Sequence, residues 1–214
     1  MKKSTEIIIN DLFLRYTNLE CCREDIVSAI ELLIEMYKSK KKLLVCGNGG
    51  SASDALHIVG ELMKAFVKPR CIEGEEKAML EDGTCEPEYL IKNLQRALPA
   101  ISLVSETALI TAYSNDNAAD LCFAQQVYGY GETGDALIGI STSGNSKNVI
   151  YAAQVARAKG VKVISLTGVG GGAIKEQSDV CICVPEKETY KIQELHLPVY
   201  HAICLAIENE FFVD

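Results

Sequence analysis

The sequence has 214 residues, of which 48% are hydrophobic, 23% charged and 7% aromatic, a composition that excludes a disordered chain and predicts one globular domain. Its 29 acidic and 21 basic residues give a net charge of -8, which argues against binding of nucleic acid through its phosphates. No apolar run reaches the ~18 residues of a membrane-spanning helix, and the first residues lack the apolar block of a secretion signal. We expect a soluble, cytoplasmic protein that binds neither nucleic acid nor membrane.

Residues 1–40 carry apolar side chains at helical spacing and contain no strand-like run. The spacing predicts two helices ahead of the sheet. A helix with one apolar stripe must bury that stripe. This extension is therefore expected to pack on its own domain or to pair subunits, and we expect an oligomer.

Across residues 41–214, short strand-like runs alternate with longer helical segments, a pattern typical of a parallel sheet covered by helices on both faces. The predicted fold class is α/β, a doubly wound five-stranded parallel sheet with an N-terminal helical extension. Ligands of such sheets bind outside the carboxyl ends of the strands. The strands are expected at Leu43–Cys46, Ala100–Val104, Ala136–Ile140, Lys162–Leu166 and Val180–Val184.

The segment from about Lys68 to Leu98 is too long for an ordinary connection, and we interpret it as an insertion. From Glu73 to Glu88 it carries seven acidic residues and a single basic residue, Lys77. We expect a solvated surface excursion with a short helix, and a lid or docking element is the alternative.

The nine cysteines are odd in number and include no Cys-x-x-Cys motif. Reduced thiols are therefore expected, most of them in the core, rather than a disulfide framework or a thiolate zinc site. We assign no role to Cys21, Cys22, Cys71 or Cys85.

The loop after the first expected strand reads Gly47-Asn48-Gly49-Gly50-Ser51-Ala52-Ser53. It matches the dinucleotide fingerprint Gly-x-Gly-x-x-Gly/Ala between a strand and a helix. A dinucleotide site also needs an acidic residue about 20 positions on, at the end of the second strand. Here that strand lies more than fifty residues away, although Glu106 follows it. A dinucleotide enzyme remains an alternative, which a nicotinamide-cofactor titration tests.

The loop after the third expected strand offers four hydroxyl groups and one amide in six residues, ahead of a helix expected over residues 147–159. Backbone N–H groups and the helix dipole favour an anion at such a helix start. A phosphate monoester is the natural ligand, and the alternative is a serine that merely caps the helix. The hydroxyls that would form the phosphate cage are those of Ser141, Thr142, Ser143 and Ser146.

The three histidines fall in two expected helices. His57 and Glu61 are four residues apart and hence on one helix face, either as an ordinary surface pair or as part of a site. In the last helix, polar residues interrupt an apolar run, and buried polar groups need partners. The interrupting residues are Gln193, Glu194, His196 and His201.

These side chains offer nitrogen and oxygen ligands that suit a divalent ion of the zinc type. Gln193 and His201 are eight residues apart, which corresponds to ~12 Å along a straight helix. One ion could bind both residues only if their side chains extended far along the helix, if the helix broke near Pro198, or if the two ligands came from different chains. We expect a site near a subunit boundary.

Together these motifs resemble the sugar isomerase (SIS) domain family and, within it, the phosphoheptose isomerases. The resemblance covers most of the chain and includes Cys-Gly-Asn-Gly-Gly-Ser, Ser-Asn-Asp, Gly-Ile-Ser-Thr-Ser-Gly-Asn-Ser, Leu-Thr-Gly and Ile-Gln-Glu-Leu-His. It implies a flavodoxin-like SIS fold and an aldose–ketose isomerase of heptose biosynthesis. The implied reaction converts sedoheptulose 7-phosphate to D-glycero-D-manno-heptose 7-phosphate through a metal-assisted enediol.

The resemblance also implies residue roles. Glu61 and His201 would be catalytic, and one Zn²⁺ per subunit would be held by His57, Glu61, Gln193 and His201. A cytoplasmic homotetramer with sites between subunits is implied as well. The substrate-binding residues would be Asn48, Gly49, Gly50, Glu61, Asn115, Asp116, Ser141, Thr142, Ser143, Ser146 and Gln193.

Two departures from the family pattern, the acidic insertion and Gly60 ahead of Glu61, leave the exact sugar phosphate open. The alternative from another class is a non-catalytic SIS protein that binds a sugar phosphate or a protein partner and has a regulatory role. Such proteins can dispense with the ligand set, and this chain keeps all four members. The sequence therefore favours the enzyme.

Overall fold

The computed structural model describes residues 1–212, and its centre is a five-stranded sheet in which every strand pair is parallel. The strand order is β2-β1-β3-β4-β5. This confirms the predicted doubly wound α/β fold, and each strand ends within two residues of its expected position. The strands are β1 (Leu43–Gly47), β2 (Ala100–Ser102), β3 (Ala136–Ile140), β4 (Lys162–Thr167) and β5 (Val180–Cys183).

Every residue of β1 and β3 is buried, because helices cover both faces of the sheet and such strands are apolar throughout. Leu43 and Val45 face one helical layer, whereas Leu44 and Cys46 face the other. Gly47 pairs with Ile140. The loops that follow β1 and β3 therefore leave the sheet side by side at its carboxyl edge.

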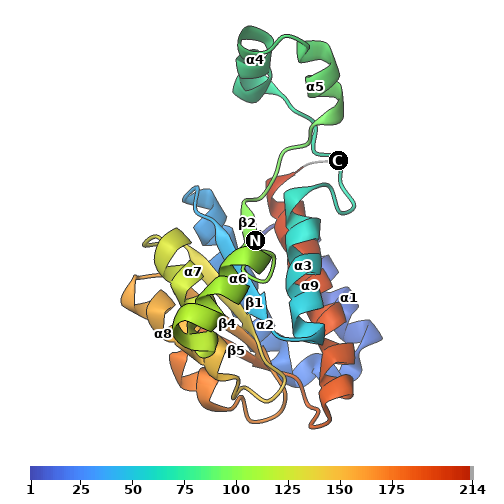
Figure 1. Ribbon diagram of the computed structural model, residues 1–214. Coiled ribbons are helices and arrows are strands. Elements are labelled where there is room, and N and C mark those ends of the chain that lie inside the picture. The colour runs from blue at the N-terminus through green and yellow to red at the C-terminus, as the bar shows by residue number, and fades with distance from the viewer. Residues whose placement is uncertain (213–214) are drawn as a thin grey trace.

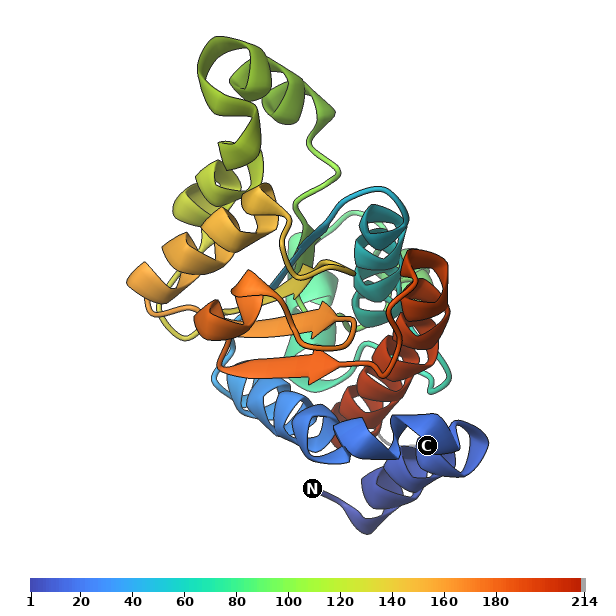
Figure 2. The ribbon, with the colours of Figure 1, turned by 90° about the horizontal axis from the view of Figure 1, so that it is seen from below.

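Two helical layers enclose the sheet (Figures 1 and 2). The first contains α2 (Arg23–Lys38), α3 (Gly50–Met63) and α9 (Thr189–Phe211), with α1 (Lys3–Arg15) packed against α9. The second contains α7 (Cys122–Tyr130) and α8 (Lys147–Ala158), with α6 (Thr107–Tyr113) beside α7. None of the helices within residues 1–212 is long and apolar enough to cross a membrane.

The N-terminal helices pack on their own domain. The backbone N–H of Lys2 donates to Glu210 Oε1 at 2.6 Å, and Asn209 Nδ2 donates to Thr5 Oγ1 at 2.8 Å. The first turns of α1 are thereby tied to the end of α9. The predicted role of these helices in oligomerisation stays a prediction.

The segment between α3 and β2 forms a helical hairpin that projects from the body of the molecule (Figure 1). It contains α4 (Gly74–Gly83) and α5 (Pro87–Asn93), and neither helix has a buried residue. We expected one short helix, whereas the structure has two. Pro87 starts the second helix because its fixed φ suits a first helical turn.

Helix α9 runs without a break from Thr189 to Phe211, with Pro198 inside it. A helix break is therefore not available to bring Gln193 and His201 together. The two residues stay ~12 Å apart along the axis.

Candidate active site

Helices α3 and α9 lie side by side on one face of the sheet (Figure 1), and their contacts show that they run in the same direction. Near the start of both helices, Gly50 meets Gln193. Two turns further along, His57 meets His201. The polar residues of the site are therefore arranged at successive levels along one helix pair.

The first level lies beside the carboxyl edge of the sheet. A Cβ atom on Gly50 would come within 2.5 Å of Gln193 Nε2, so the glycine is required for Gln193 to lie over the start of α3. Gly49 precedes the helix with a φ of 56°, a left-handed conformation that favours glycine. Asn48, Gly49 and Gly50 are exposed at this edge.

The second level joins His57, Glu61 and His201. His57 Nε2 lies 3.2 Å from Glu61 Oε1, and Lys64 Nζ lies 3.2 Å from Glu61 Oε2. The His57 and His201 ring centroids are 4.9 Å apart. The Glu61 side chain is 13% exposed, against 42% for His57. The predicted pair on α3 is thus a partly buried pair that faces α9.

Two further residues extend this level. Tyr200 donates its hydroxyl hydrogen to Asp54 Oδ1 at 3.2 Å, and the same hydroxyl lies 3.0 Å from His57 Nδ1. Burial raises the pKa of Asp54, and the Tyr200 bond and the charge of His57 offset this only in part. Burial also raises the pKa of the Tyr200 hydroxyl.

The residue types of the second level fit a zinc ion. His201 Nε2 is buried without a hydrogen-bond partner, and burial, followed by the charge of His57, lowers the pKa of this imidazole. A neutral imidazole is the form that binds a metal. Within residues 1–212, however, no three His, Cys, Asp or Glu side chains converge as they stand on one metal position. These side chains are therefore of the types that bind zinc, but within residues 1–212 of one chain they do not converge on a single metal position.

At the third level, a fully buried ion pair between Arg70 and Glu208 connects the segment after α3 to α9. Arg70 Nε donates to Glu208 Oε1 at 2.9 Å, and the remaining guanidinium nitrogens donate to the carbonyl oxygens of Leu62 and Glu61. Glu208 also accepts three backbone N–H bonds from residues 66–68. Burial raises the pKa of Glu208, but these hydrogen bonds outweigh it and the net pKa is lowered.

The serine loop, residues 141–146, is tightly folded. Ser141 Oγ donates to Ser146 Oγ at 3.0 Å. Ser146 precedes α8 but makes no side-chain capping bond, so the capping alternative is wrong for this residue. Ser143 Oγ accepts the Asn145 N–H within the loop. The oxygen-rich loop therefore lies at a helix start whose first N–H groups its side chains do not cap.

The glycine loop and the serine loop are joined by two asparagines. The Asn48 and Asn148 side-chain amides exchange two hydrogen bonds of 2.9 Å. The residues predicted to bind substrate on these two loops thus lie side by side.

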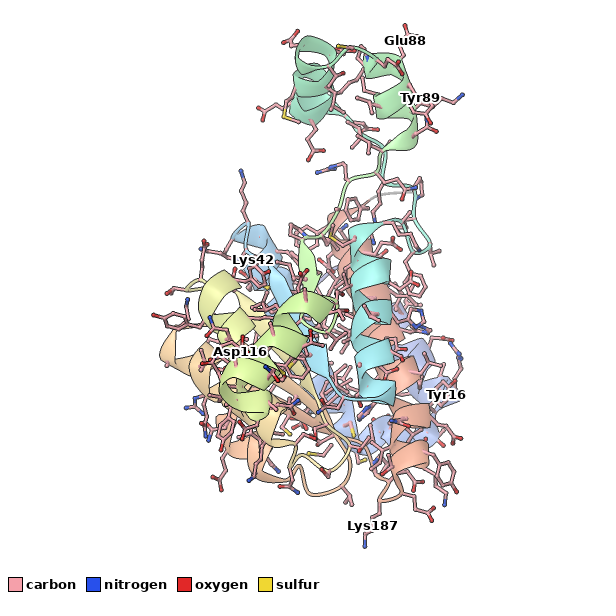
Figure 3. All side chains as sticks on the ribbon, viewed as in Figure 1. Tyr16, Lys42, Glu88, Tyr89, Asp116 and Lys187 are labelled. Atoms are coloured by element: carbon pink, nitrogen blue, oxygen red, sulfur yellow. The ribbon has the colours of Figure 1, made fainter. Side chains whose placement is uncertain are left out.

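Asn115 and Asp116 lie in the turn that follows α6. They occupy an exposed π-helical turn, Ser114–Ala118, and Asn115 Nδ2 donates to Asp116 Oδ1 at 2.9 Å. Asp116 lies beyond the end of α6 (Figure 3). Within the described chain, no hydrogen bond joins either residue to the serine loop or to the α3–α9 contact.

Sequence reasoning did not find Asp54, Asn148, Tyr200 or the Arg70–Glu208 pair. Glu208 interrupts the apolar end of the last helix, so the reasoning applied to Gln193 and His201 could have found it. Asp54 lies three residues before His57 and could have been placed on the same helix face. Tyr200 and Arg70 give no such local signal.

Comparison with known proteins shows what this chain is similar to. A family model described as SIS domain matches residues 90–168. The chain is 41% identical over 189 residues to a phosphoheptose isomerase of a Nitratiruptor species, covering 88% of each chain. It is 41% identical over 188 residues to that of Citrifermentans bemidjiense, covering 88% of this chain and 85% of the relative.

Solved structures of the same kind share the fold. Phosphoheptose isomerase GmhA from Neisseria gonorrhoeae aligns with a TM-score of 0.73 at 33% identity, covering 96% of this chain and 97% of the other. A phosphoheptose isomerase from Francisella tularensis aligns with a TM-score of 0.72 at 28% identity, covering 96% and 93%.

Proposed function

The chain belongs to the phosphoheptose isomerase family of SIS domain proteins, and from this premise we propose that it converts sedoheptulose 7-phosphate to D-glycero-D-manno-heptose 7-phosphate. That it is a sugar-phosphate isomerase follows from the family. The main support for this specific reaction is that the Glu61 carboxylate is grouped with the imidazoles of His57 and His201 where α3 packs against α9.

Glu61 and His201 are proposed to move the protons. Conversion of a ketose to an aldose transfers one proton between adjacent carbons, through an enediol, and another between their oxygens. The Glu61 carboxylate takes the proton from C1 and returns it at C2. His201 moves the proton between the two oxygens.

The serine loop is proposed to hold the phosphate. The hydroxyls of Ser141, Thr142, Ser143 and Ser146 and the first N–H groups of α8 provide donors for an anion. Binding the phosphate far from the reacting carbons fixes the register of the sugar. Asn48, Gly49, Gly50 and Gln193 would contact the sugar next to this loop, and Asn115 and Asp116 would do so from the exposed turn.

One Zn²⁺ per subunit is proposed as the cofactor, with His57, Glu61, Gln193 and His201 as its ligands. When bound, zinc acts as a Lewis acid that polarises a carbonyl oxygen. Because Gln193 lies about 12 Å from His201 along α9, we propose that the ligands of one ion come from two subunits.

A homotetramer is the proposed assembly. A cavity of about 500 Å³ between α1 and α9 has His201 in its wall, together with Ile7, Leu12, Leu197 and Leu205. Ile7 is 69% exposed and Leu197 is 40% exposed in the single chain. Exposed apolar patches of this kind mark interaction sites, and a neighbouring subunit would cover this one next to the catalytic histidine.

The function is tested by a coupled assay that follows sedoheptulose 7-phosphate turnover. Glu61→Gln keeps the shape of the side chain but removes the base. It is expected to lower kcat by roughly 10² to 10⁴-fold. Glu31→Gln, on the exposed face of α2, is the matched control and is expected to retain full activity.

Full turnover by Glu61→Gln would contradict the role of the carboxylate. Absence of turnover in the unaltered protein, together with measurable sugar-phosphate binding, would instead support the regulatory alternative.

A further inference from the structure

A chain of polar contacts crosses from α3 to α9 and back at the second level of the site. Asp54 and His57 both contact the hydroxyl of Tyr200, and His57 contacts Glu61 through its other ring nitrogen. Tyr200 is 2% exposed, and Asp54 Oδ2 is buried without a partner. Nothing in the proposed proton transfers uses Asp54 or Tyr200.

The direction of each hydrogen bond in this chain can be worked out. A tyrosine hydroxyl has one hydrogen to donate. Tyr200 donates it to Asp54 Oδ1, so the hydroxyl oxygen can only accept from His57. The 3.0 Å contact at Nδ1 is then a hydrogen bond in which His57 Nδ1–H is the donor. In neutral His57 the other nitrogen, Nε2, carries a lone pair.

We propose that Tyr200, oriented by Asp54, is a positioning residue that holds His57 in its Nδ1–H tautomer and turns the Nε2 lone pair toward Glu61. The ring is also held in place by packing. The ring of Tyr200 lies edge-on to those of His57 and His201, with centroids 5.5 Å and 5.0 Å away. Rotation of the His57 imidazole would break its hydrogen bond to Tyr200 and disturb its ring contact with that residue.

This arrangement turns an acceptor atom of His57 toward an acceptor atom of Glu61. The Nε2 lone pair and the carboxylate oxygen are 3.2 Å apart, and a cation beside them would be attracted by both. A metal-binding histidine commonly donates its second ring nitrogen to a hydrogen-bond partner, which fixes the tautomer and the ring orientation. Asp54 and Tyr200 supply such a partner, so this inference rests on the proposed function only for the identity of the cation.

The tautomer is measured directly by long-range ¹H–¹⁵N NMR of the metal-free full-length protein, labelled on histidine, at a pH where imidazole is neutral. The chain has three histidines, and His57→Gln identifies the signal of His57. The expected result is the Nδ1–H pattern for His57. An Nε2–H pattern in the unaltered protein would overturn the proposal.

Three variants separate the proposed bonds. In Asp54→Ala the Tyr200 hydroxyl loses its acceptor and turns to donate to His57, so the tautomer is expected to change to Nε2–H. Asp54→Asn keeps an acceptor oxygen and is expected to keep Nδ1–H. Tyr200→Phe keeps the ring but not the hydroxyl, and a mixture of tautomers is expected.

The matched control is Tyr37→Phe, a buried tyrosine of α2 whose hydroxyl donates to the Pro99 carbonyl. It is expected to leave the His57 signal unchanged. An unchanged signal in both Asp54→Ala and Tyr200→Phe would overturn the proposal. Circular dichroism establishes that each variant is folded, and the two variants act through different atoms, so loss of one leaves the other.

Zinc affinity gives a second readout that does not depend on turnover. Competition with a chromophoric chelator is expected to show a zinc dissociation constant 10- to 100-fold higher in Tyr200→Phe than in the unaltered protein or in Tyr37→Phe. Equal affinities in all three would overturn the positioning role. Failure of the unaltered protein to bind zinc, with the Nδ1–H tautomer present, would contradict the proposed cofactor and leave the tautomer assignment standing.

Discussion

His196 is carried by the helix of the candidate site but belongs to the core. It has no exposed surface, its Nε2 lies 3.3 Å from the Thr167 carbonyl oxygen, and its Nδ1 has no partner. Burial lowers the pKa of His196 to about 4. The sequence groups it with Gln193 and His201 as a residue interrupting an apolar run, whereas the structure turns it toward the end of β4.

This histidine predicts an acid-sensitive fold. The unfolded chain binds the His196 proton near pH 6.5 and the folded protein only near pH 4, so the stability due to the neutral imidazole is lost as the pH falls through this window. Between pH 7.5 and 5, chemical denaturation is expected to show a loss roughly 2 kcal/mol larger in the unaltered protein than in His196→Gln. Equal losses in the two proteins would contradict this prediction.

Addition of one methyl group at Gly144 is expected to destabilise the folded protein. Its φ is 66°, and a Cβ would overlap the Gly171 carbonyl oxygen. Gly144→Ala is expected to lower the free energy of unfolding by at least about 2 kcal/mol and to open the serine loop. Urea denaturation measures the change in stability, and inhibition by inorganic phosphate measures the change in the loop.

The control for this substitution is Gly60→Ala. Gly60 lies inside α3, and a Cβ there would meet nothing within 4 Å. It is expected to stabilise the protein by about 0.5–1 kcal/mol. The interpretation of the loop fails if both substitutions have the same effect.

How well the sequence predicts a contact between two residues depends on how far apart they are along the chain. His57 and Glu61 could be paired because a helix brings residues four apart together. The contact of Tyr200 with Asp54 spans 146 positions and depends on how α3 and α9 pack, which no local pattern contains. The predicted roles of the individual site residues stay predictions.

At the scale of elements, the buried Arg70–Glu208 pair holds α3 to α9 beyond the candidate site. Both side chains are almost completely buried, at 0% and 1% exposure. Arg70 also supplies hydrogen bonds to the carbonyl oxygens of Glu61 and Leu62. The pair thereby sets the position of the last turn of α3, which carries Glu61.

Arg70→Met is expected to cost about 3–5 kcal/mol, because it leaves Glu208 charged, buried and without its counterion. Thermal and urea denaturation measure this loss. Arg15→Met is the control, since Arg15 pairs with Asp11 at the surface, where both side chains are more than half exposed. A small effect of Arg70→Met, similar to that of the control, would contradict the bracing role.

The strands were predictable because a strand buried on both faces is a continuous apolar run between loop signals. The packing of the helices against one another was less predictable from the sequence. The apolar spacing of the last helix predicts a helix, but not that α1, α2 and α3 all pack against it. The uninterrupted path through Pro198 also runs against the local preference of proline.

At the scale of the whole molecule, the exposed apolar residues of the first helix predict association. Leu14 is 79% exposed in the single chain. Leu14→Asp and Ile7→Asp are expected to reduce the mass measured by light scattering from that of a tetramer to that of a smaller species. A single chain loses little by either change, so a tetrameric mass in both variants would exclude this face from the interface.

The helical hairpin predicts a tolerated deletion. The Arg96 N–H donates to the Arg70 carbonyl oxygen at 2.8 Å, so the two ends of the insertion are close, and Glu88 and Tyr89 lie at its far end (Figure 3). Replacement of residues 73–93 by a short Gly-Ser linker is expected to leave the far-UV spectrum and the melting temperature nearly unchanged. A large drop in melting temperature would show that the hairpin supports the fold.

The same deletion separates the two interpretations of the insertion. Turnover is retained if the hairpin is a surface excursion. Loss of turnover with the fold intact would indicate a lid or a docking element.

The order of the strands in the chain has a consequence during synthesis on the ribosome. β1 is synthesised first, but its two neighbours, β2 and β3, begin only at residues 100 and 136. At about 5–20 residues per second, this apolar strand waits several seconds for its partners. α9 follows all five strands, so a nascent chain cannot assemble the contact between His57 and His201 before that helix emerges. If His57 and His201 act on the sugar as proposed, an incomplete chain has no activity until α9 has been synthesised.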